Sequence, residues 1–561
     1  MAERWRHRLH NAALAFPKYP GLRFSYGTSG FRTEASVLGS VAFRAGVLAG
    51  LRSLVTGKAT GLVITASHNQ ATDNGVKMVD PSGGMLARNW EPFAEDIANA
   101  VDVLEVVETI IKNESVHENW KGKVLIARDT RPSGQALVAA AVKGIEAMGV
   151  APVNMGVLTT PQLHWMVRAT NKGEPQVNEL AYYTKLSEAF KLLLDLNPRK
   201  PAVPRCLDIV VDGANGVGAR KLLDLQMLIE GLNLEVRNSG EGELNHLAGA
   251  DFVQKEKVLP AGFAASADSD RRCVTVDGDA DRLAYFYVSG DGIFHLLDGD
   301  KILSLFARFL KQQVEALMGS EKDCIIPGYG RVNLGAVQTA YANGSSTKYL
   351  QEVLGLEVVL TPTGVKYLHE EAEKLDIGVY FEANGHGTVL FSERFLDFLR
   401  RESASSEILN SRLRACKRLL AVSEMVNQAI GDAISGLLMV EVVLTYSVWD
   451  VREWDALYED VPSRQLKVKV KDRTCITTTN AETKVSRPAE LQSAIDKEVE
   501  NFTKGRAFVR PSGTEDVVRV YAEAGTQELA DELAANVAVA VYELAGGVGP
   551  KPAKNVITGS L

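Results

Sequence analysis

The sequence predicts an α/β protein of several domains, and three observations support that fold class. The chain has 561 residues, which at about 100–200 residues per domain corresponds to roughly three to five domains. Short runs rich in Val and Ile recur along the chain, and each leads into a loop that contains glycine. Residues 454–470 change to alternating apolar and polar positions, a pattern typical of an antiparallel α+β unit.

The repeated pattern predicts strands followed by loops and helices through most of the chain. Residues 123–149 show it fully, with an apolar run, a polar loop and a helical stretch that stops at Gly149. Uninterrupted apolar runs followed by helices indicate parallel strands buried on both faces. We predict such strands within residues 61–75, 123–149, 207–224, 273–288, 323–341 and 377–391, a helix at 302–313, and boundaries in the polar stretches 171–179 and 296–301.

Composition excludes several classes of protein. Hydrophobic residues make up 46% of the chain and charged residues 24%, which excludes a chain disordered throughout. Lys and Arg total 62 against 70 Asp and Glu, and the net charge of −8 argues against nucleic-acid binding but allows a local basic pocket. No apolar run reaches about 18 residues, so we expect no transmembrane helix and no membrane association.

Cysteine usage and the N-terminus predict a cytoplasmic location. The five cysteines are single and form no Cys-x-x-Cys pair, which fits a reducing compartment. The first residues are basic but lack the apolar core of a secretory signal. We expect a soluble cytoplasmic protein with no obligate protein partner.

The first candidate motif is TASHN, residues 65–69, which follows a predicted buried strand. Ser67 is therefore expected at the carboxyl end of a strand, where α/β sheets bind ligands. Adjacent Ser67 and His68 point apart on an extended loop, so they do not indicate a nucleophile and its base. The alternative is a polar turn in which Ser and Asn satisfy the backbone.

The second candidate motif is DGDADR, residues 277–282, which places three carboxylates two residues apart. Such carboxylates repel one another unless a cation lies among them, and oxygen ligands favour Mg²⁺ or Ca²⁺. Arg282 and Val288 stand where an EF-hand needs Gly and Glu, so an EF-hand is excluded. A solvated acidic turn and a phosphatase loop with Asp277 as nucleophile both stay open here.

Two further loops fit the binding of a phosphorylated sugar. RPSGTE, residues 510–515, combines a guanidinium, hydroxyls and an accessible backbone, which suits a phosphate. EANGHG, residues 382–387, offers a carboxylate and an amide to sugar hydroxyls. The alternatives are a Pro-Gly turn for the first loop and a hairpin with Asn-Gly turn chemistry for the second.

Two other loops are given structural interpretations. In RDTRPSG, residues 128–134, we expect Asp129 or Ser133 to cap the following helix. GANGVG, residues 213–218, resembles a dinucleotide-binding loop, but its glycines are out of register with that fingerprint, which disfavours nucleotide binding.

Taken in order, the motifs TASHN, DGDADR, EANGHG and RPSGTE resemble those of the α-D-phosphohexomutase superfamily. The resemblance runs from about Phe24 to about Val541. It is closer to the branch that acts on N-acetylglucosamine phosphates, because EANGH stands where glucose and mannose mutases have GExSGH. Supporting stretches are residues 67–83, 294–302, 363–372, 376–391 and 454–470.

The resemblance implies a four-domain, phosphohexomutase-like fold around a central cleft, with three α/β domains of shared topology and a C-terminal α+β domain. The expected domains are 1–178 with the phosphoserine loop, 179–297 with the metal loop, 298–455 with the sugar loop and 456–561 with the phosphate loop.

The resemblance also implies an isomerase that interconverts N-acetylglucosamine 6-phosphate and 1-phosphate, on the route to UDP-N-acetylglucosamine. The expected path runs through a phosphoserine enzyme and a 1,6-bisphosphate, with Mg²⁺ and a hexose 1,6-bisphosphate as cofactors and sugar phosphates as the ligands. A phosphoglucomutase or phosphomannomutase is the alternative. A catalytically silent sugar-phosphate sensor is disfavoured by the intact Ser67 and carboxylates.

Individual roles follow from the same resemblance. Ser67 is similar to the catalytic phosphoserine, and the proton acceptor for the sugar hydroxyl is sought among Lys77, His68 and Arg32. The implied Mg²⁺ ligands are Ser67, Asp277, Asp279 and Asp281; the implied sugar contacts are Glu382, Ala383 and Asn384; and the implied site for the phosphate that is not being transferred is Arg510, Pro511, Ser512, Gly513, Thr514 and Arg519.

Overall fold

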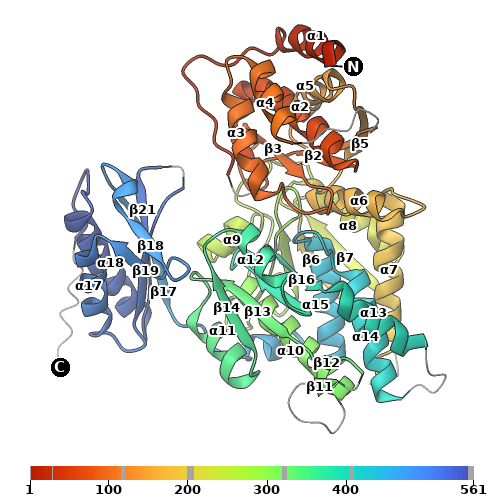
Figure 1. Ribbon diagram of the computed structural model, residues 1–561. Coiled ribbons are helices and arrows are strands. Elements are labelled where there is room, and N and C mark those ends of the chain that lie inside the picture. The colour runs from red at the N-terminus through yellow and green to blue at the C-terminus, as the bar shows by residue number, and fades with distance from the viewer. Residues whose placement is uncertain are drawn as a thin grey trace.

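The computed structural model describes residues 2–27, 30–114, 121–198, 207–318, 325–326, 328–404, 410–513 and 515–553. These residues form three mixed α/β units and a smaller antiparallel unit, termed units I to IV in chain order. Unit I lies at the top of Figure 1, units II and III lie beneath it, and unit IV lies to one side. The predicted α/β architecture with a C-terminal α+β domain is confirmed.

Unit I contains a five-stranded sheet in the order β1-β3-β2-β4-β5. Its strands are β1 (Phe31–Glu34), β2 (Thr60–Ile64), β3 (Asp73–Val79), β4 (Lys123–Arg128) and β5 (Ala151–Val157). Its helices are α1 (Ala2–Ala13), α2 (Gly39–Thr56), α3 (Glu91–Asn99), α4 (Val103–Asn113), α5 (Gly134–Ala147) and α6 (Thr160–Lys172), with 3₁₀ turns η1 (Ala35–Val37) and η2 (Arg88–Trp90). Helix α7 (Glu179–Asp195) leads to unit II.

Unit II contains a second five-stranded sheet in the order β10-β9-β8-β6-β7. Its elements are β6 (Leu207–Asp212), α8 (Val217–Gln226), β7 (Leu232–Arg237), α9 (Ala250–Glu256), β8 (Cys273–Val276), β9 (Leu283–Val288) and β10 (Phe294–Leu297).

Unit III contains a four-stranded sheet in the order β14-β13-β15-β16 and a small hairpin, β11 (Ile325–Ile326) with β12 (Gly330–Arg331). The sheet strands are β13 (Leu334–Thr339), β14 (Glu357–Thr361), β15 (Ile377–Phe381) and β16 (Gly387–Phe391). The helices are α10 (Gly299–Met318), α11 (Gly344–Lys348), the π-helical turn η3 (Tyr349–Val353), α12 (Val365–Ala372), α13 (Glu393–Ala404), α14 (Ser411–Met425), α15 (Ala433–Ser447) and α16 (Val451–Asp455).

The three larger sheets share a strand order. Numbering four strands of each sheet along the chain (β2–β5, β6–β9 and β13–β16) gives the order 2-1-3-4 every time. The direction differs, because the antiparallel member is the second strand, β3, in unit I but the fourth strand, β9 or β16, in units II and III. The shared topology expected from the sequence therefore holds for strand order, while two strand directions differ in unit I, where the second strand is antiparallel and the fourth, β5, is parallel.

The strands of unit I are buried on both faces, as their apolar runs predict. Ile64 and Ile126 pack in the core that contains helices α2 and α5. Their neighbours Val63 and Leu125 point the other way, into a core with Leu163 of α6. Successive residues of a strand face opposite sides, so a strand covered on both sides must be apolar throughout.

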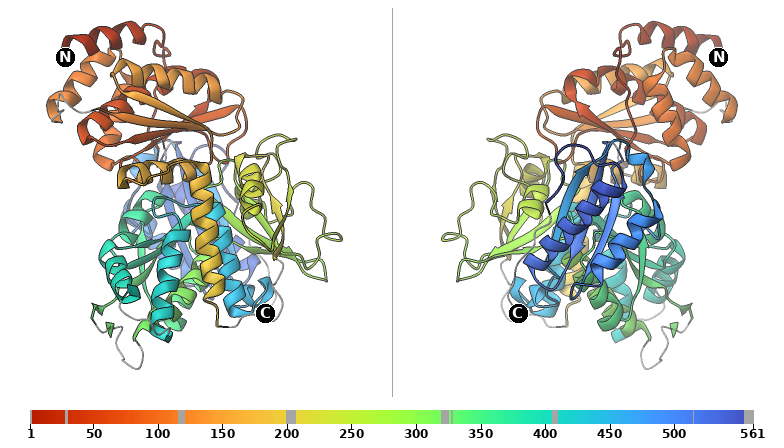
Figure 2. Two further views of the ribbon diagram at one scale, coloured as in Figure 1. Left: turned by 90° about the vertical axis from the view of Figure 1, so that its right-hand side faces the viewer. Right: turned by 90° about the vertical axis from the view of Figure 1, so that its left-hand side faces the viewer.

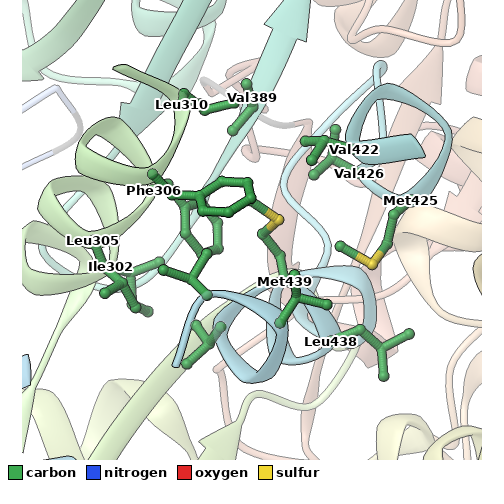
Figure 3. Close-up of a cluster of buried hydrophobic side chains, with 14 of the residues drawn as sticks. Ile302, Leu305, Phe306, Leu310, Val389, Val422, Met425, Val426, Leu438 and Met439 are labelled. Atoms are coloured by element: carbon green, nitrogen blue, oxygen red, sulfur yellow. The ribbon is translucent and has the colours of Figure 1, made fainter. Parts of the chain in front are cut away.

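Units II and III share one continuous core. It joins β6, β8 and β9 of unit II to α10, α14 and α15 of unit III, and Figure 3 shows Phe306 of α10 packed near Met439 of α15 and Val389 of β16. Helices α7 and α15 lie side by side between the units (Figure 2). The two units therefore form one packed base beneath unit I. The boundaries predicted after residues 178, 297 and 455 remain predictions.

Unit IV has its own core and a different architecture. Strands β17 (Ser463–Lys469), β21 (Val517–Glu523) and β20 (Arg506–Pro511) form an antiparallel sheet, and β18 (Thr477–Thr479) pairs with β19 (Lys484–Arg487). Helices α17 (Ala489–Val499) and α18 (Gln527–Leu544) pack on it, and η4 (Arg473–Cys475) is a short turn. No helix in the described part of the chain is both long and apolar enough to cross a membrane.

Candidate active site

Ser67 lies in a tight turn directly after β2, at the carboxyl end of a central strand of unit I. Its side chain is buried, and its backbone is left-handed, with φ of 52°. That conformation is uncommon for a residue other than glycine, and strained backbones of this kind cluster at functional sites. The Ser67 amide donates to the Thr65 hydroxyl at 3.1 Å.

Arg131 and Asn245 anchor the Ser67 turn from two directions. Arg131 of unit I donates to the carbonyls of Ser67 at 3.0 Å, Asn69 at 2.9 Å and Gln70 at 2.6 Å. Asn245 of unit II donates to the Ser67 and Asn69 carbonyls at 2.9 Å each. The Gln70 carbonyl also accepts the Asp73 amide at 3.1 Å, and the two side chains supply hydrogen bonds to the Ser67 and Asn69 carbonyls.

The expectation that Asp129 or Ser133 caps a helix is wrong. Ser133 makes no capping hydrogen bond, and its hydroxyl accepts from Asn74 at 2.8 Å. Asp129 is buried, accepts the Thr65 hydroxyl at 2.7 Å and pairs with Arg131 at 3.0 Å. The RDTRPSG loop therefore supports the Ser67 turn, because tertiary contacts outcompete the local cap.

The DGDADR loop of unit II meets Ser67 at the same place. The Ser67 hydroxyl donates to Asp277 Oδ2 at 2.6 Å, across 210 residues of sequence. Asp277 also accepts the amides of Asp281 at 3.0 Å and Arg282 at 3.1 Å, which closes the loop on itself. The GANGVG stretch supports it from behind: a Cβ at Gly216 would lie 2.5 Å from the Gly278 carbonyl.

Lys77 supplies a buried positive charge to this cluster. Its ammonium donates to Asp279 and to Asp281 at 2.7 Å each, and the Thr160 hydroxyl donates to Asp279 at 2.6 Å. Burial opposes the charged ammonium, yet the two carboxylates outweigh burial and raise the pKa of Lys77. Lys77 is therefore protonated in this arrangement.

The three carboxylates respond differently to burial. Burial, reinforced by Asp281 and Asp279, raises the pKa of Asp277 well above its usual range. Burial also opposes ionisation of Asp279 and Asp281, but Lys77 lowers the pKa of both below the usual range. Lys77 thus offsets two negative charges, and the third carboxyl has no cation of its own within hydrogen-bonding distance.

The carboxylates fit a divalent cation. Oxygen atoms of Asp277, Asp279 and Asp281 lie within 4.8 Å of one another, and these residues are buried. The Oδ1 atoms of Asp279 and Asp281 accept no hydrogen bond, although His386 Nδ1 lies 3.3 Å from Asp281 Oδ1. Buried carboxylate oxygens are costly without a partner. Oxygen ligands in this arrangement favour a hard cation such as Mg²⁺.

The predicted sugar loop is the hairpin between β15 and β16, and it touches the carboxylate loop. The Glu382 amide donates to the His386 carbonyl at 2.9 Å, and the Asn384 amide group donates to Glu382 at 3.2 Å. The Leu283 amide donates to the Gly385 carbonyl at 3.1 Å, next to the carboxylates. Residues 382–384 are half-buried. A hairpin is present, but it is not the two-residue Asn-Gly turn of the alternative, because Phe381 pairs with Gly387 and only Gly385 of the Asn-Gly pair is left-handed. The hairpin places these side chains beside the three carboxylates.

The three candidates for the proton acceptor differ in charge. Lys77 is protonated, as described above. Arg32 donates to Asn69 at 3.1 Å, and burial lowers its pKa, but a guanidinium stays charged in proteins. Burial, helped by Arg282, lowers the pKa of His68 to about 3, so its imidazole is neutral near pH 7.

The predicted phosphate loop connects β20 and β21 of unit IV. Arg510 and Arg519 are direct partners across these antiparallel strands, so two guanidinium groups start from neighbouring positions. The Ser512 amide donates to the Val517 carbonyl at 2.8 Å, which closes the turn, and Arg473 donates to the Gly513 carbonyl at 3.0 Å. Pro511 ends β20. Thr514 lies outside the described residues.

Sequence reasoning missed Arg131, Thr160, Asn245 and His386 as parts of the site. His386 stands inside the quoted EANGHG motif, and Arg131 stands in the RDTRPSG loop, so both had a local signal. Thr160 and Asn245 have none, because they reach the site only through the packing of α6 and of the loop before α9.

Comparisons with known proteins agree with this geometry. Residues 298–449 match the family "Phosphoacetylglucosamine mutase AMG1, domain III". Residues 466–540 match "Phosphoglucomutase/phosphomannomutase, C-terminal domain". Residues 51–105 and 95–175 match "Phosphoglucomutase/phosphomannomutase, alpha/beta/alpha domain I".

Curated relatives and solved structures match almost end to end. Phosphoacetylglucosamine mutase of Oryza sativa subsp. japonica is 52% identical over 94% of this chain and 95% of its own length. The Homo sapiens protein of that name is 47% identical over 95% and 96%. A crystal structure of Aspergillus fumigatus N-acetylphosphoglucosamine mutase in complex with GlcNAc-6P and magnesium superposes with a TM-score of 0.88 at 40% identity, over 97% of this chain and 99% of that chain.

Proposed function

The chain belongs to the phosphoacetylglucosamine mutases of the α-D-phosphohexomutase superfamily, and we propose that Ser67 carries the phosphoryl group that the reaction moves. The enzyme interconverts N-acetylglucosamine 6-phosphate and N-acetylglucosamine 1-phosphate. Its own residues must therefore bind a sugar phosphate in two orientations and exchange one phosphoryl group with it.

In the proposed path, phosphorylated Ser67 transfers its phosphoryl group to the free hydroxyl of the bound sugar. The bond from phosphorus to Ser67 Oγ breaks, a bond to the sugar oxygen forms, the sugar hydroxyl loses its proton to a proton acceptor, and Ser67 Oγ takes up one proton to become a hydroxyl. The resulting 1,6-bisphosphate reverses its orientation in the site and then returns its other phosphoryl group to Ser67. When Ser67 is unphosphorylated, Asp277 holds its hydroxyl at 2.6 Å, so the position of the hydroxyl is set while the bisphosphate is bound.

Asp277, Asp279, Asp281 and the Ser67 oxygen are the proposed ligands of Mg²⁺. When bound there, the ion neutralises charge on the transferring phosphoryl group. Lys77 and Arg282 add fixed positive charge around the same carboxylates, as Lys77 donates to two of them and Arg282 lies 4.0 Å from Asp277. Positioned charge of this kind is the main contribution of a protein to phosphoryl transfer.

Glu382, Ala383 and Asn384 are proposed to bind sugar hydroxyls, and Arg510, Pro511, Ser512, Gly513, Thr514 and Arg519 the second phosphate. Binding energy at a distant phosphate orients the reacting end of the sugar. The second phosphate site lies on unit IV, which has a core of its own. A separately packed unit can adjust while the bisphosphate changes orientation.

The observation that carries the proposal is the contact between Ser67 and Asp277. It joins loops of two units whose motifs are separated by 210 residues, and it buries a hydroxyl against a cluster suited to a cation. Neither a polar surface turn nor an isolated acidic loop would require this buried contact between the two motifs.

The test supplies N-acetylglucosamine 6-phosphate, Mg²⁺ and a trace of hexose 1,6-bisphosphate, and measures the 1-phosphate and free phosphate together. We expect 1-phosphate without free phosphate, lost in Ser67→Ala and retained in the control Ser36→Ala. Free phosphate from an active Ser67→Ala enzyme would instead indicate a phosphatase with Asp277 as nucleophile. Faster turnover of glucose or mannose 6-phosphate would favour the hexose mutase alternative.

The second phosphate site has its own test. Arg510→Ala should raise KM for the sugar phosphate by at least about tenfold, because one charge-assisted hydrogen bond is lost. Phosphorylation of Ser67 by the bisphosphate should stay measurable in that variant. An unchanged KM would remove Arg510 from the site.

The proposed compartment is the cytoplasm. Cys273, Cys416 and Cys475 are free thiols in the described part of the chain, which supports a reducing environment. Cell fractionation with an antibody to the native protein tests this, and recovery in a secreted fraction would contradict it.

A further inference from the structure

Glu482 joins the proposed phosphate site of unit IV to unit III. One carboxylate oxygen accepts Arg510 Nε at 3.1 Å. The other accepts the backbone amide of Thr363 at 2.8 Å and the Thr363 hydroxyl at 2.6 Å. The side chains of Arg510 and Glu482 are 18% and 20% exposed, so this bridge is largely shielded from water. The Glu482 carboxylate therefore links the phosphate site of unit IV to a residue of unit III that lies 119 positions earlier in the chain.

The backbone that presents Glu482 is unusual. Glu482 follows Asn480 and Ala481 in the turn between β18 and β19. The φ values are 50° at Asn480, 52° at Ala481 and 68° at Glu482. Three successive left-handed residues without a glycine cost conformational energy, which surrounding contacts must offset. The turn is therefore shaped to carry Glu482 toward unit III, where Thr363 supplies two donors, in addition to Arg510 of unit IV.

The unit III side of the bridge suits an anion. Thr363 and Gly364 directly precede helix α12 (Val365–Ala372), whose N-terminal end carries unpaired amides and a partial positive charge. An apolar seam continues the contact, since Tyr341 of unit III packs edge-on against Phe508 of β20 with ring centroids 5.1 Å apart. The Glu482 bridge therefore lies beside a packed interface between units III and IV and is not an isolated ion pair on the surface.

We propose that Glu482 is a positioning residue for Arg510: it orients the guanidinium for the sugar phosphate and fastens unit IV to the Thr363 turn. The hydrogen bond uses Nε of Arg510 and not a terminal nitrogen. A guanidinium is planar, so a bond at Nε fixes the plane in which the terminal nitrogens meet a phosphate. This inference rests on the proposed assignment of Arg510 to the second phosphate.

The first experiment separates substrate binding from turnover in Glu482→Ala. We expect KM for N-acetylglucosamine 6-phosphate to rise about tenfold, the cost of one charge-assisted hydrogen bond, with kcat changed less than about twofold. Glu482→Gln keeps the shape of the side chain and one acceptor oxygen, so it can accept from Arg510 or from the Thr363 amide but not from both, and it should restore part of the loss. Glu490→Ala, which removes an exposed carboxylate on α17 of the same unit, is the matched control and should leave KM unchanged.

A double-mutant cycle decides whether Glu482 acts through Arg510. In an Arg510→Ala background, Glu482→Ala should cause no further rise in KM, because residues that act as one unit are not additive. Thr363→Val removes the hydroxyl partner and should raise KM by a smaller factor, which provides a second route if Glu482→Ala folds poorly.

Three results would overturn the inference. A fall in KM for Glu482→Ala would mean that the carboxylate competes with the phosphate. An unchanged KM would mean that the bridge has no bearing on binding, and a full additional effect on Arg510→Ala would mean that Glu482 acts independently of it. If Arg510→Ala alone left KM unchanged, the phosphate site itself would be misassigned, which is distinguishable from failure of Glu482.

Discussion

Gly299→Ala tests whether the sugar loop is positioned by direct packing on helix α10. Gly299 begins α10, and its amide donates to the Ala383 carbonyl at 3.2 Å. A Cβ at this position would lie 1.9 Å from the Glu382 carbonyl oxygen, whereas ordinary contact begins at 3.4 Å. The loop or the helix must therefore retreat by about 1.5 Å, because both atoms of the clash belong to a rigid backbone.

That displacement is large on the scale of catalysis. A misplacement of about 1 Å costs roughly a hundredfold in rate, which corresponds to about 2.7 kcal/mol of transition-state stabilisation. We expect kcat/KM for N-acetylglucosamine 6-phosphate to fall about a hundredfold, measured by following formation of the 1-phosphate. Overpacking should also lower the free energy of unfolding by about 1–3 kcal/mol, so activity is measured well below the melting temperature.

The matched control is Gly39→Ala, at the first residue of α2. A Cβ there meets no atom within 4 Å, so activity should be unchanged. If Gly299→Ala kept kcat/KM within about twofold of the parent, close packing of α10 would not position the sugar loop. Equal losses in both variants would trace the effect to helix starts in general and would refute the argument as well.

Three further predictions concern the proposed metal ligands, the Ser67 turn and acid stability. Mg²⁺ at about 100 times its dissociation constant should stabilise the parent protein by about 2.7 kcal/mol, measured by thermal unfolding with and without a chelator. Asp279→Asn should lose both this stabilisation and turnover. If Mg²⁺ still stabilised the variant, the ion would bind elsewhere. Arg131→Lys should lower kcat by at least about tenfold, because one ammonium cannot reach the carbonyls that the guanidinium spans. The extent of Ser67 phosphorylation after incubation with bisphosphate, measured by mass spectrometry, should fall as well. Unchanged phosphorylation would contradict the anchoring role of Arg131. Burial lowers the pKa of His164 to about 3, against about 6.5 when unfolded, so the unfolded state binds the proton first and stability falls as pH drops from about 6.5 toward 3. At pH 5 this amounts to about 2 kcal/mol, and urea unfolding of His164→Gln should show a shallower loss between pH 7 and 5; identical slopes would exclude His164 as the source.

Much of the fold could be predicted from local sequence. The apolar runs at 61–65 and 123–128 predict strands because a strand covered on both faces needs apolar residues at every position. The structure places β2 and β4 there. What the runs did not reveal is direction: β3 is antiparallel in unit I, whereas the corresponding strands of units II and III are parallel to their neighbours. Direction depends on how the chain returns to the sheet, and residues 66–72 make a short turn where the other units use a helix.

The candidate site residues were also proposed from the sequence, and their roles remain predictions. Asp277, Asp279 and Asp281 are two residues apart, so the loop itself must bring their charges together, and repulsion makes a cation the physical solution. The resemblance of four ordered motifs added the roles of Ser67 and the sugar and phosphate loops. These inferences depend on local spacing and residue type, which the chain specifies directly.

Only the tertiary structure decided what surrounds those residues. Asn245 donates to the Ser67 carbonyl from 178 residues away, Thr160 reaches Asp279 across 119 residues, and Glu482 meets Thr363 across 119 more. No local pattern marks these residues, because their hydrogen-bonding capacity is common and only their position is special. Their partners are set when units I to IV pack together. The sequence by itself determined which polar and charged groups are candidates for the chemistry, and packing between units determined how they are oriented, charged and shielded from water.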